Sequence, residues 1–287
     1  MSNPHDIRWL IESDVFPDYQ DEMARTIRET GASVTLLTAA KAGYSFEEAG
    51  QPDPRLAGPD NCVIFHGCIG LAERVVEQTD WKPGVFGNFD RLACTSYFPP
   101  LGKFLLNDRY CMLPFGELRR MRTELFRTLG QGGQFFMRPN TTRKVFAGMV
   151  VRQESFERDL ELASFYDVPD HELVVVSPVQ ALVREWRFVV VDGQVISGSC
   201  YREGSENCRT SDCPSGAVQF ADQVASSGWE PDRAWTIDVA LTASGTFRLI
   251  EIGSFSFANL YGCDLRSVVA AIQEVAWDDW ARSREMR

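Results

Sequence analysis

The sequence has few of the residues that usually build metal centres and nucleophilic active sites. It contains only three histidines, and its eight cysteines include no C-x-x-C pair. Cys200, Cys208 and Cys213 lie close together in the sequence, but no fourth ligand at zinc spacing accompanies them. We therefore expect reduced thiols rather than a zinc site, and any catalysis has to use other side chains.

The sequence also lacks a hydrophobic run long enough to cross a bilayer, and its polar start, MSNPHDIRW, does not resemble a signal peptide. Lys and Arg are scattered in a chain of net charge −11, which disfavours a broad nucleic-acid surface. We expect a cytoplasmic protein that binds neither membrane nor nucleic acid. Its 287 residues, 44% of them hydrophobic, suffice for two or three compact units, and the oligomeric state stays open.

The first part of the chain alternates between strand-like and helix-like segments. Strands are expected at residues 9–11, 33–38 and 62–66, and helices at 21–30 and 71–78. This order predicts an α/β layer of the Rossmann type. No G-x-G-x-x-G motif accompanies it, so the sequence does not support dinucleotide binding.

A connecting region rich in Gly, Pro and aromatic residues, 79–115, leads to a second predicted unit. Its expected elements are strands at 134–138, 144–152 and 172–176 and a helix at 156–166. Ser177-Pro178 then interrupts the pattern. Because proline cannot donate to a strand ladder, this dipeptide is predicted to be a hinge between two lobes.

The most informative stretch is REWRFVVVDGQVISGSCYR, in which Asp192-Gly193 separates two β-rich arms. A two-residue turn there predicts four facing pairs: Val191 with Gln194, Arg187 with Gly198, Glu185 with Cys200, and Val183 with Arg202. Strand alternation then places Glu185, Arg187 and Arg202 on one face of the sheet. Three charges on one face of two adjacent strands do not form a hydrophobic core.

A second hairpin is predicted from WTIDVAL to TFRLIEI, followed by a terminal helix at 265–284. With a two-residue Ser-Gly turn, Asp238 lies directly opposite Glu251, and such like charges repel unless a cation bridges them. A four-residue loop also keeps both carboxylates on one face, whereas an odd loop without a bulge does not. The alternative is that both are solvated residues on an exposed sheet face.

Two groups of polar residues in these units suit a metal-bound nucleotide. Asp238 and Glu251, with Asn259 shortly after, offer the oxygen ligands that magnesium prefers. Arg138 and Lys144 flank RPNTTRK, a short turn that can offer backbone N–H groups and two cations to a polyphosphate. Taken alone, these two cations could equally be surface charges.

The strand containing FMRP, the strand containing EWR and the terminal D…E pair of strands together resemble the ATP-grasp superfamily, in particular small bacterial and phage members of the carboxylate-amine ligase type. The resemblance covers about residues 110–270. It implies an ATP-grasp fold of two α+β lobes preceded by a Rossmann-like domain. The expected domains are residues 1–110 for the Rossmann-like unit, 111–178 for the smaller lobe, and 179–287 for the larger lobe with the metal site.

The resemblance also implies a role for each matching position. Phosphate binding falls to Arg138 and Lys144, adenine binding to the hinge at Val176, Ser177 and Val179, ribose binding to Glu185, substrate-carboxylate or γ-phosphate binding to Arg187 and Arg202, and magnesium binding to Asp238, Glu251 and the substitute ligand Asn259. One position departs from the family pattern E-x-N, since Gly253 stands where the asparagine is expected. Arg187 and Arg202 could instead pair with Glu185 in a structural ion network.

The activity implied by the resemblance uses ATP and Mg²⁺ to activate a carboxylate as an acyl-phosphate, which an amine or a thiol captures with release of ADP and phosphate. The substrates would be a small-molecule carboxylate and an amine, or a peptide. The alternatives are an ATP-dependent phosphotransferase and a nucleotide-binding module without catalysis. The loop at 203–216, with Arg209, is expected to be a flap, and His66 to be a strand-end residue, with a substrate role as its alternative.

Overall fold

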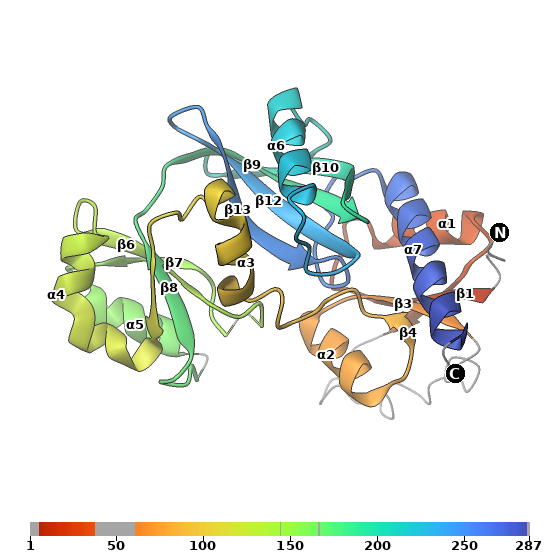
Figure 1. The fold of residues 1–287 in the computed structure, drawn as a ribbon, viewed down its shortest axis with the longest axis horizontal. Helices are drawn as coiled ribbons and strands as arrows, with labels where there is room; N and C mark the ends of the chain where they lie inside the picture. The colour runs from red at the N-terminus through yellow and green to blue at the C-terminus, as the bar shows by residue number, and fades with distance from the viewer. Residues whose placement is uncertain (1–5, 38–60, 144, 166, 286–287) are drawn as a thin grey trace.

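Three β-sheets follow one another along the chain in the computed structural model, which describes residues 6–37, 61–143, 145–165 and 167–285 (Figure 1). The first is a parallel four-stranded sheet, and the other two are antiparallel sheets of four and five strands. This is the arrangement expected from the sequence: an α/β layer followed by two α+β units.

The N-terminal sheet has the strand order β2-β1-β3-β4. Its strands and helices are β1 (Ile7–Glu12), α1 (Gln20–Glu29), β2 (Ser33–Leu37), β3 (Cys62–His66), α2 (Ile69–Gln78) and β4 (Lys82–Gly84). The chain leaves β1 for β2 on one side and adds β3 on the other, so the carboxyl ends of β1 and β3 form a topological switch point. The C-terminal helix α7 (Leu265–Glu285) packs here, with Ile272 in the same buried cluster as Trp9.

The four-stranded antiparallel sheet has the order β5-β8-β6-β7. Its elements are β5 (Cys111–Pro114), η3 (Phe115–Glu117), α4 (Leu118–Thr128), β6 (Gln134–Pro139), β7 (Met149–Arg152), α5 (Phe156–Ser164) and β8 (Leu173–Ser177). Strand β7 starts later than the expected residue 144, and the helix α4 was not expected. Only Leu118 and Leu125 of α4 are buried, so its sequence carries a weak apolar stripe.

The region 79–115, expected to be a connection, contains β4, β5, a helix α3 (Cys94–Leu101) and a short η2 (Gly102–Phe104). Pro99 and Pro100 lie inside α3 and lack the amide hydrogen of an ordinary helical residue, which hides the helix from a sequence pattern. Tyr97, Phe98 and Leu101 of α3 are buried against the five-stranded sheet.

The five-stranded sheet has the order β11-β10-β9-β12-β13. Its elements are β9 (Leu182–Val191), β10 (Gln194–Glu203), β11 (Glu206–Thr210), α6 (Ser215–Ala225), β12 (Ala234–Thr242) and β13 (Phe247–Ser254). One face is apolar: Trp186, Phe188 and Val239 are buried with Ala217 and Ala221 of α6. Because side chains alternate along a strand, the charged residues of the same strands lie on the other face.

The hairpin of β9 and β10 turns at Asp192-Gly193 as expected, and Val191 faces Gln194. Beyond that pair the expected register is wrong, because irregularities between Val195 and Ser197 and between Cys200 and Arg202 shift the pairing. The observed partners are Phe188 for Gly198, Trp186 for Cys200 and Glu185 for Arg202, in place of Arg187, Glu185 and Val183.

The hairpin of β12 and β13 places Asp238 directly opposite Glu251, as the sequence predicted. The route differs from the expected one. Leu241 faces Phe247, and Thr242 closes a three-residue loop by bonding to Thr246. An irregularity between Asp238 and Val239 leaves one extra residue on β13, which compensates for the odd loop and returns both carboxylates to one face.

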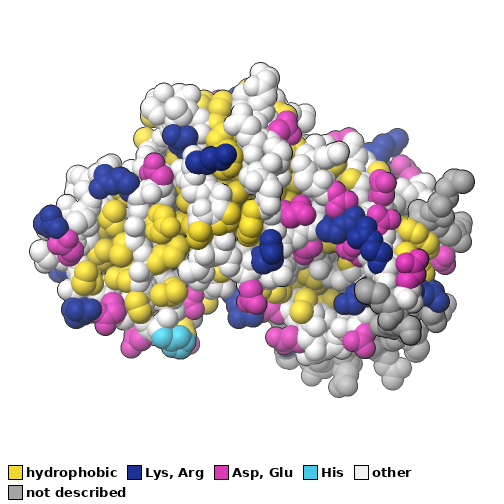
Figure 2. Space-filling model, viewed as in Figure 1, with side chains coloured by type: hydrophobic (Ala, Val, Ile, Leu, Met, Phe, Trp, Pro, Cys, Tyr) yellow, Lys and Arg dark blue, Asp and Glu magenta, His cyan; other side chains and the backbone are white. Residues whose placement is uncertain are grey.

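The surface carries both signs of charge. Figure 2 shows Lys and Arg side chains scattered among Asp and Glu on one face, without one continuous basic area. This distribution agrees with the expectation of no broad nucleic-acid surface on that face. Within the described residues, no helix is both long and apolar enough to span a membrane.

Candidate functional site

A buried ion pair marks the charged face of the five-stranded sheet. Arg187 on β9 donates from Nε and Nη2 to the two carboxylate oxygens of Asp238 on β12, with both distances 2.7 Å. The side chains are only 14% and 5% exposed. Arg187 also donates from Nη1 to the backbone carbonyl of Asn259 at 3.1 Å. The two parallel hydrogen bonds fix the guanidinium plane on this face.

Two tyrosines that the sequence did not single out complete the environment of Arg187. The rings of Tyr201 and Tyr261 stack with their centroids 5.0 Å apart, and the guanidinium lies 5.8 and 5.3 Å from them. The Tyr201 hydroxyl donates to Glu185 Oε2 at 2.8 Å. Regular alternation would put Tyr201 and Arg202 on opposite faces, so the irregularity beside them on β10 concealed this residue.

A second ion pair joins the two antiparallel sheets. Arg138 on β6 donates from Nη2 to Glu251 Oε2 at 2.7 Å, and its Nη1 lies 3.4 Å from the carbonyl oxygen of Ile250. Since Glu251 faces Asp238 across the β12–β13 ladder, the two ion pairs are neighbours. The structure therefore brings Arg138, Arg187, Asp238 and Glu251 into one cluster.

The charges in this cluster are set by burial and by pairing. Burial raises the pKa of Glu185, although the Tyr201 hydrogen bond and Arg202 act against the shift. Burial also raises the pKa of Asp238, and Arg187 opposes that change. For Arg187 burial acts to lower the pKa, but Asp238 outweighs it and the pKa stays above its ordinary value. The guanidinium groups are therefore permanently charged, and the carboxylates beside them neutralise that charge.

Other predicted site residues lie around the cluster. Arg202 Nη1 lies 3.6 Å from Glu185 Oε1, so these two form the ion pair that the alternative interpretation foresaw. Val176 and Ser177 end β8, and Val179 lies in the link to β9. The Ser177 hydroxyl is fully buried and has no hydrogen-bond partner among the described residues. Lys144 lies outside the described residues.

The donor set for a metal consists of two carboxylates and the neighbourhood of Asn259. The Asn259 Oδ1 atom accepts a hydrogen bond from the Tyr261 amide at 2.8 Å. Within the described part of the chain, no three His, Cys, Asp or Glu side chains group together as metal ligands. A carboxylate has about four acceptor positions, so Asp238 can bind a cation while it keeps both hydrogen bonds to Arg187. The residues thus fit magnesium in the chemistry of their oxygens.

The departure at Gly253 has a packing reason. A Cβ atom at this position would lie 2.7 Å from Oγ1 of Thr236, which faces Gly253 across the β12–β13 ladder and is buried. Any side chain there, including the asparagine of the family pattern, requires Thr236 to move.

A second polar group lies at the switch point of the N-terminal sheet. His66 Nε2 and the Tyr19 hydroxyl are 3.0 Å apart, and the Leu260 amide donates to the same hydroxyl at 3.2 Å. Burial lowers the pKa of His66 to about 4, so the ring is neutral at pH 7. Nearby, Glu12 Oε2 accepts a hydrogen bond from the Cys68 amide at 2.7 Å. His66 is thus a strand-end residue that connects the N-terminal sheet to the segment following β13.

The region 203–216, expected to be a flexible flap, is partly regular. It contains the edge strand β11 and the first turn of α6. Arg209 on β11 forms an ion pair with Asp18, which belongs to the N-terminal part of the chain. The edge strand therefore bridges the five-stranded sheet and the N-terminal part.

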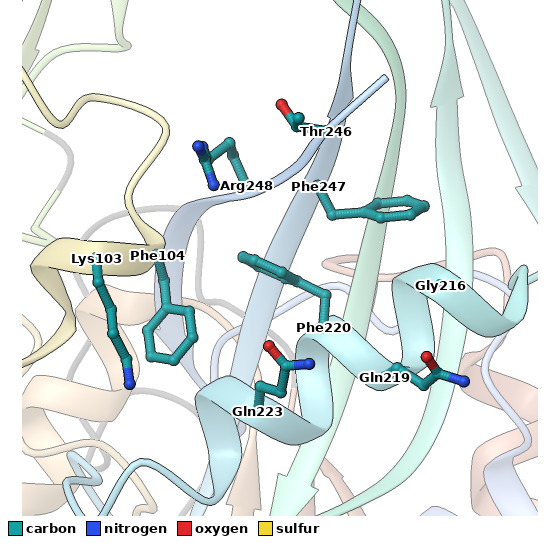
Figure 3. A pocket seen from close by; sticks show the side chains of 9 residues that line it. All are labelled: Lys103, Phe104, Gly216, Gln219, Phe220, Gln223, Thr246, Phe247 and Arg248. Carbon is teal, nitrogen blue, oxygen red and sulfur yellow. The ribbon is translucent and has the colours of Figure 1, made fainter. Parts of the chain in front are cut away.

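The open cavities lie away from the cluster. One of about 570 Å³ lies over the α6 side of the five-stranded sheet, where Lys103 and Arg248 flank an aromatic floor that includes Phe104 and Phe220 (Figure 3). Another, of about 630 Å³, is lined by Arg122, the Gly132-Gly133 turn and neighbouring residues. Neither is lined by the clustered ion pairs.

Comparison with known proteins agrees with this architecture. A sequence model described as an ATP-grasp domain, family 2 of its clade, matches residues 118–271, which is more than half of the chain. No curated protein matches the chain. Among solved structures, D-cycloserine synthetase DcsG has 14% identity and a TM-score of 0.63, with 94% of this chain and 99% of that chain covered.

Two further solved structures have the same fold at similarly low identity. D-alanyl-alanine synthetase A of Vibrio cholerae has 12% identity and a TM-score of 0.61, with 96% of this chain and 99% of that chain covered. The ATP-grasp ligase PsnB, crystallised with a minimal precursor, Mg and ADP, has 12% identity, a TM-score of 0.53 and the same coverage.

Proposed function

The chain belongs to the ATP-grasp family, and from this premise we propose that it is an ATP-dependent ligase that joins a carboxylate to an amine or a thiol. The observation that carries the proposal is the cluster of Arg187–Asp238 and Arg138–Glu251 ion pairs. The printed names of the structural neighbours, two synthetases and a ligase, support this reaction class.

In this proposal the nucleotide lies between the two antiparallel sheets. Residues 1–110 form the preceding domain, 111–178 the smaller lobe and 179–287 the larger lobe. Backbone groups of the hinge at 176–179 contact the adenine, and the buried Ser177 hydroxyl gains the hydrogen-bond partner that it lacks. Glu185 accepts from a ribose hydroxyl, and Arg138 with Lys144 holds the phosphates.

Asp238 and Glu251, with Asn259 beside them, would hold magnesium in this proposal. The ion would shield the phosphate charge that otherwise repels both carboxylates. The side chains themselves provide a fixed arrangement, because each carboxylate is already held by an arginine. No reorganisation of buried charge is then needed when the nucleotide arrives.

Arg187 and Arg202 are proposed to orient the reacting groups. The substrate carboxylate attacks the γ-phosphorus of ATP, the bond to the β,γ-bridging oxygen breaks, and ADP leaves. The amine then attacks the carbonyl carbon of the acyl-phosphate and expels phosphate, losing a proton to solvent. Guanidinium groups hold the carboxylate in line and neutralise charge on the transferred phosphoryl group.

The decisive assay measures ADP release against panels of carboxylates and amines. Ligation predicts ADP release that needs both partners, whereas a phosphotransferase needs no amine and accumulates a phosphorylated product. A non-catalytic module, which the absent side chain at Gly253 would favour, predicts that ATP raises the melting temperature without turnover.

A matched pair of variants connects the assay to the site. Arg187→Lys removes the bidentate geometry at Asp238 and is expected to abolish most turnover. Arg233→Lys is the control, since Arg233 is also a half-buried arginine that pairs with carboxylates, namely Asp192 and Asp279, but these are outside the cluster. Equal loss of turnover in both variants would contradict the assigned role of Arg187.

A further inference from the structure

Two thiols on neighbouring strands of the five-stranded sheet are in direct contact. Cys208 Sγ on β11 donates a hydrogen bond to Cys200 Sγ on β10, and the two sulfurs are 3.2 Å apart. In the strand ladder Cys200 faces Thr210, not Cys208, and the register shifts between Cys200 and Arg202. The irregular edge of the sheet thus brings together two cysteines that regular pairing would not place opposite each other.

The two thiols differ in access to solvent and in acidity. Cys200 is fully buried, whereas Cys208 is partly exposed on the edge strand. Burial raises the pKa of Cys200 to about 12. Cys200 also donates to the carbonyl oxygen of Arg202 at 3.6 Å, so its proton points away from Cys208. This leaves Cys208 as the thiol that an external reagent reaches, and Cys200 as the thiol that reaches Cys208.

We propose that Cys200 and Cys208 are a redox-active pair that forms a disulfide on reaction with a small-molecule disulfide such as glutathione disulfide. The Cys208 thiolate attacks one sulfur of the reagent, and one glutathione thiolate leaves. Cys200 Sγ then attacks Cys208 Sγ, its proton passes to the second glutathione thiolate, and that thiol leaves. The two protein thiols are oxidised, and the reagent is reduced to two thiols. The sulfurs have to approach by only about 1 Å to reach bonding distance.

The bond would fix an element that connects two parts of the molecule. Strand β11 carries Arg209, which pairs with Asp18 in the N-terminal part, and β10 carries Arg202, which pairs with Glu185. A covalent link between the strands would hold both arginines in their present positions. This inference is independent of the proposed ligase activity, because it depends only on the geometry of the two thiols.

Trypsin separates the relevant cysteines, so peptide mapping tests the proposal directly. Cleavage after arginine puts Cys200 in the peptide 188–202, Cys208 in 203–209 and Cys213 in 210–233. The folded full-length protein is incubated with glutathione disulfide, alkylated, and digested without reductant. The expected result is a cross-link between 188–202 and 203–209, and an intact mass lower by about 2 Da for the two hydrogens lost. Titratable thiols should fall from eight to six.

Two variants make the result specific. Cys208→Ser is expected to retain its remaining thiols, and Cys213→Ser, in which only the neighbouring cysteine is changed, should still form the cross-link. A cross-link that involves 210–233, a stable glutathione adduct on Cys208 without ring closure, or retention of all eight thiols would each overturn the proposal.

Discussion

Arg187 and Asp238 are bound to each other through two parallel hydrogen bonds of 2.7 Å across neighbouring strands of one sheet. Few solvent molecules can reach either side chain, since both are largely buried. Each charge is tolerated in this position only because the other is present. The pair therefore affects both the stability of the five-stranded sheet and the chemistry proposed for it.

The first prediction separates these two effects. Arg187→Ala leaves the Asp238 carboxylate buried without its cation, and we expect a loss of about 3–5 kcal/mol in unfolding free energy. The double variant Arg187→Met/Asp238→Leu removes both charges and should recover most of that loss while remaining inactive. Urea denaturation measures the stability of all three proteins. A double variant as unstable as Arg187→Ala would show that the uncompensated charge is not the cause.

The second prediction concerns the contact between Gly253 and Thr236. Gly253→Ala places a Cβ atom 2.7 Å from Thr236 Oγ1, so we expect a destabilisation of about 1–3 kcal/mol. Adding Thr236→Ala removes the clashing hydroxyl, and the double variant should be less destabilised than the sum of the two single variants. Thermal denaturation of the four proteins forms a double-mutant cycle. Strict additivity would mean that the close approach has no energetic consequence.

The third prediction is a pH dependence of stability from His66. Its pKa falls from about 6.5 in an unfolded chain to about 4 in the folded protein, because the ring is buried. The unfolded state thus binds more protons between these values, and the stabilisation is complete above pH 6.5 and lost as the pH falls toward 4. Between pH 7 and pH 5 we expect His66 to account for a loss of about 2 kcal/mol.

Urea unfolding at the two pH values checks this prediction in His66→Gln, which cannot take up the proton. The variant should lose less stability on acidification than the unmodified protein does. His171→Gln is the matched control, because His171 lies exposed on the surface. If His66→Gln and the unmodified protein showed the same pH dependence, the buried ring would not be the titrating group.

The fourth prediction concerns magnesium. Glu251→Gln keeps the shape of the side chain but removes one of the two facing carboxylates. We expect ATP to raise the melting temperature of this variant by a similar amount with magnesium and with a chelator, whereas the unmodified protein responds more strongly with magnesium. Glu157→Gln changes an exposed carboxylate on α5 and should behave like the unmodified protein. A full magnesium response in Glu251→Gln would exclude Glu251 as a ligand.

Sequence patterns were most reliable where neighbouring residues decide the structure. Asp192-Gly193 specifies its hairpin turn, and alternating apolar residues define β9 and β12, because turn preference and strand alternation act over a few positions. The helices α3 and α4 escaped prediction since two prolines and a sparse apolar stripe weaken their local signals.

The sequence by itself determined the order of the three sheets, the two hairpins and the facing carboxylates Asp238 and Glu251. Tertiary structure decided the register beyond the turn, the approach of Tyr201 to Arg187, and the ion pair between Arg138 and Glu251, which are 113 positions apart. The physical reason is range. Turn and strand preferences arise from adjacent residues, whereas bulges and contacts between sheets depend on how distant segments pack.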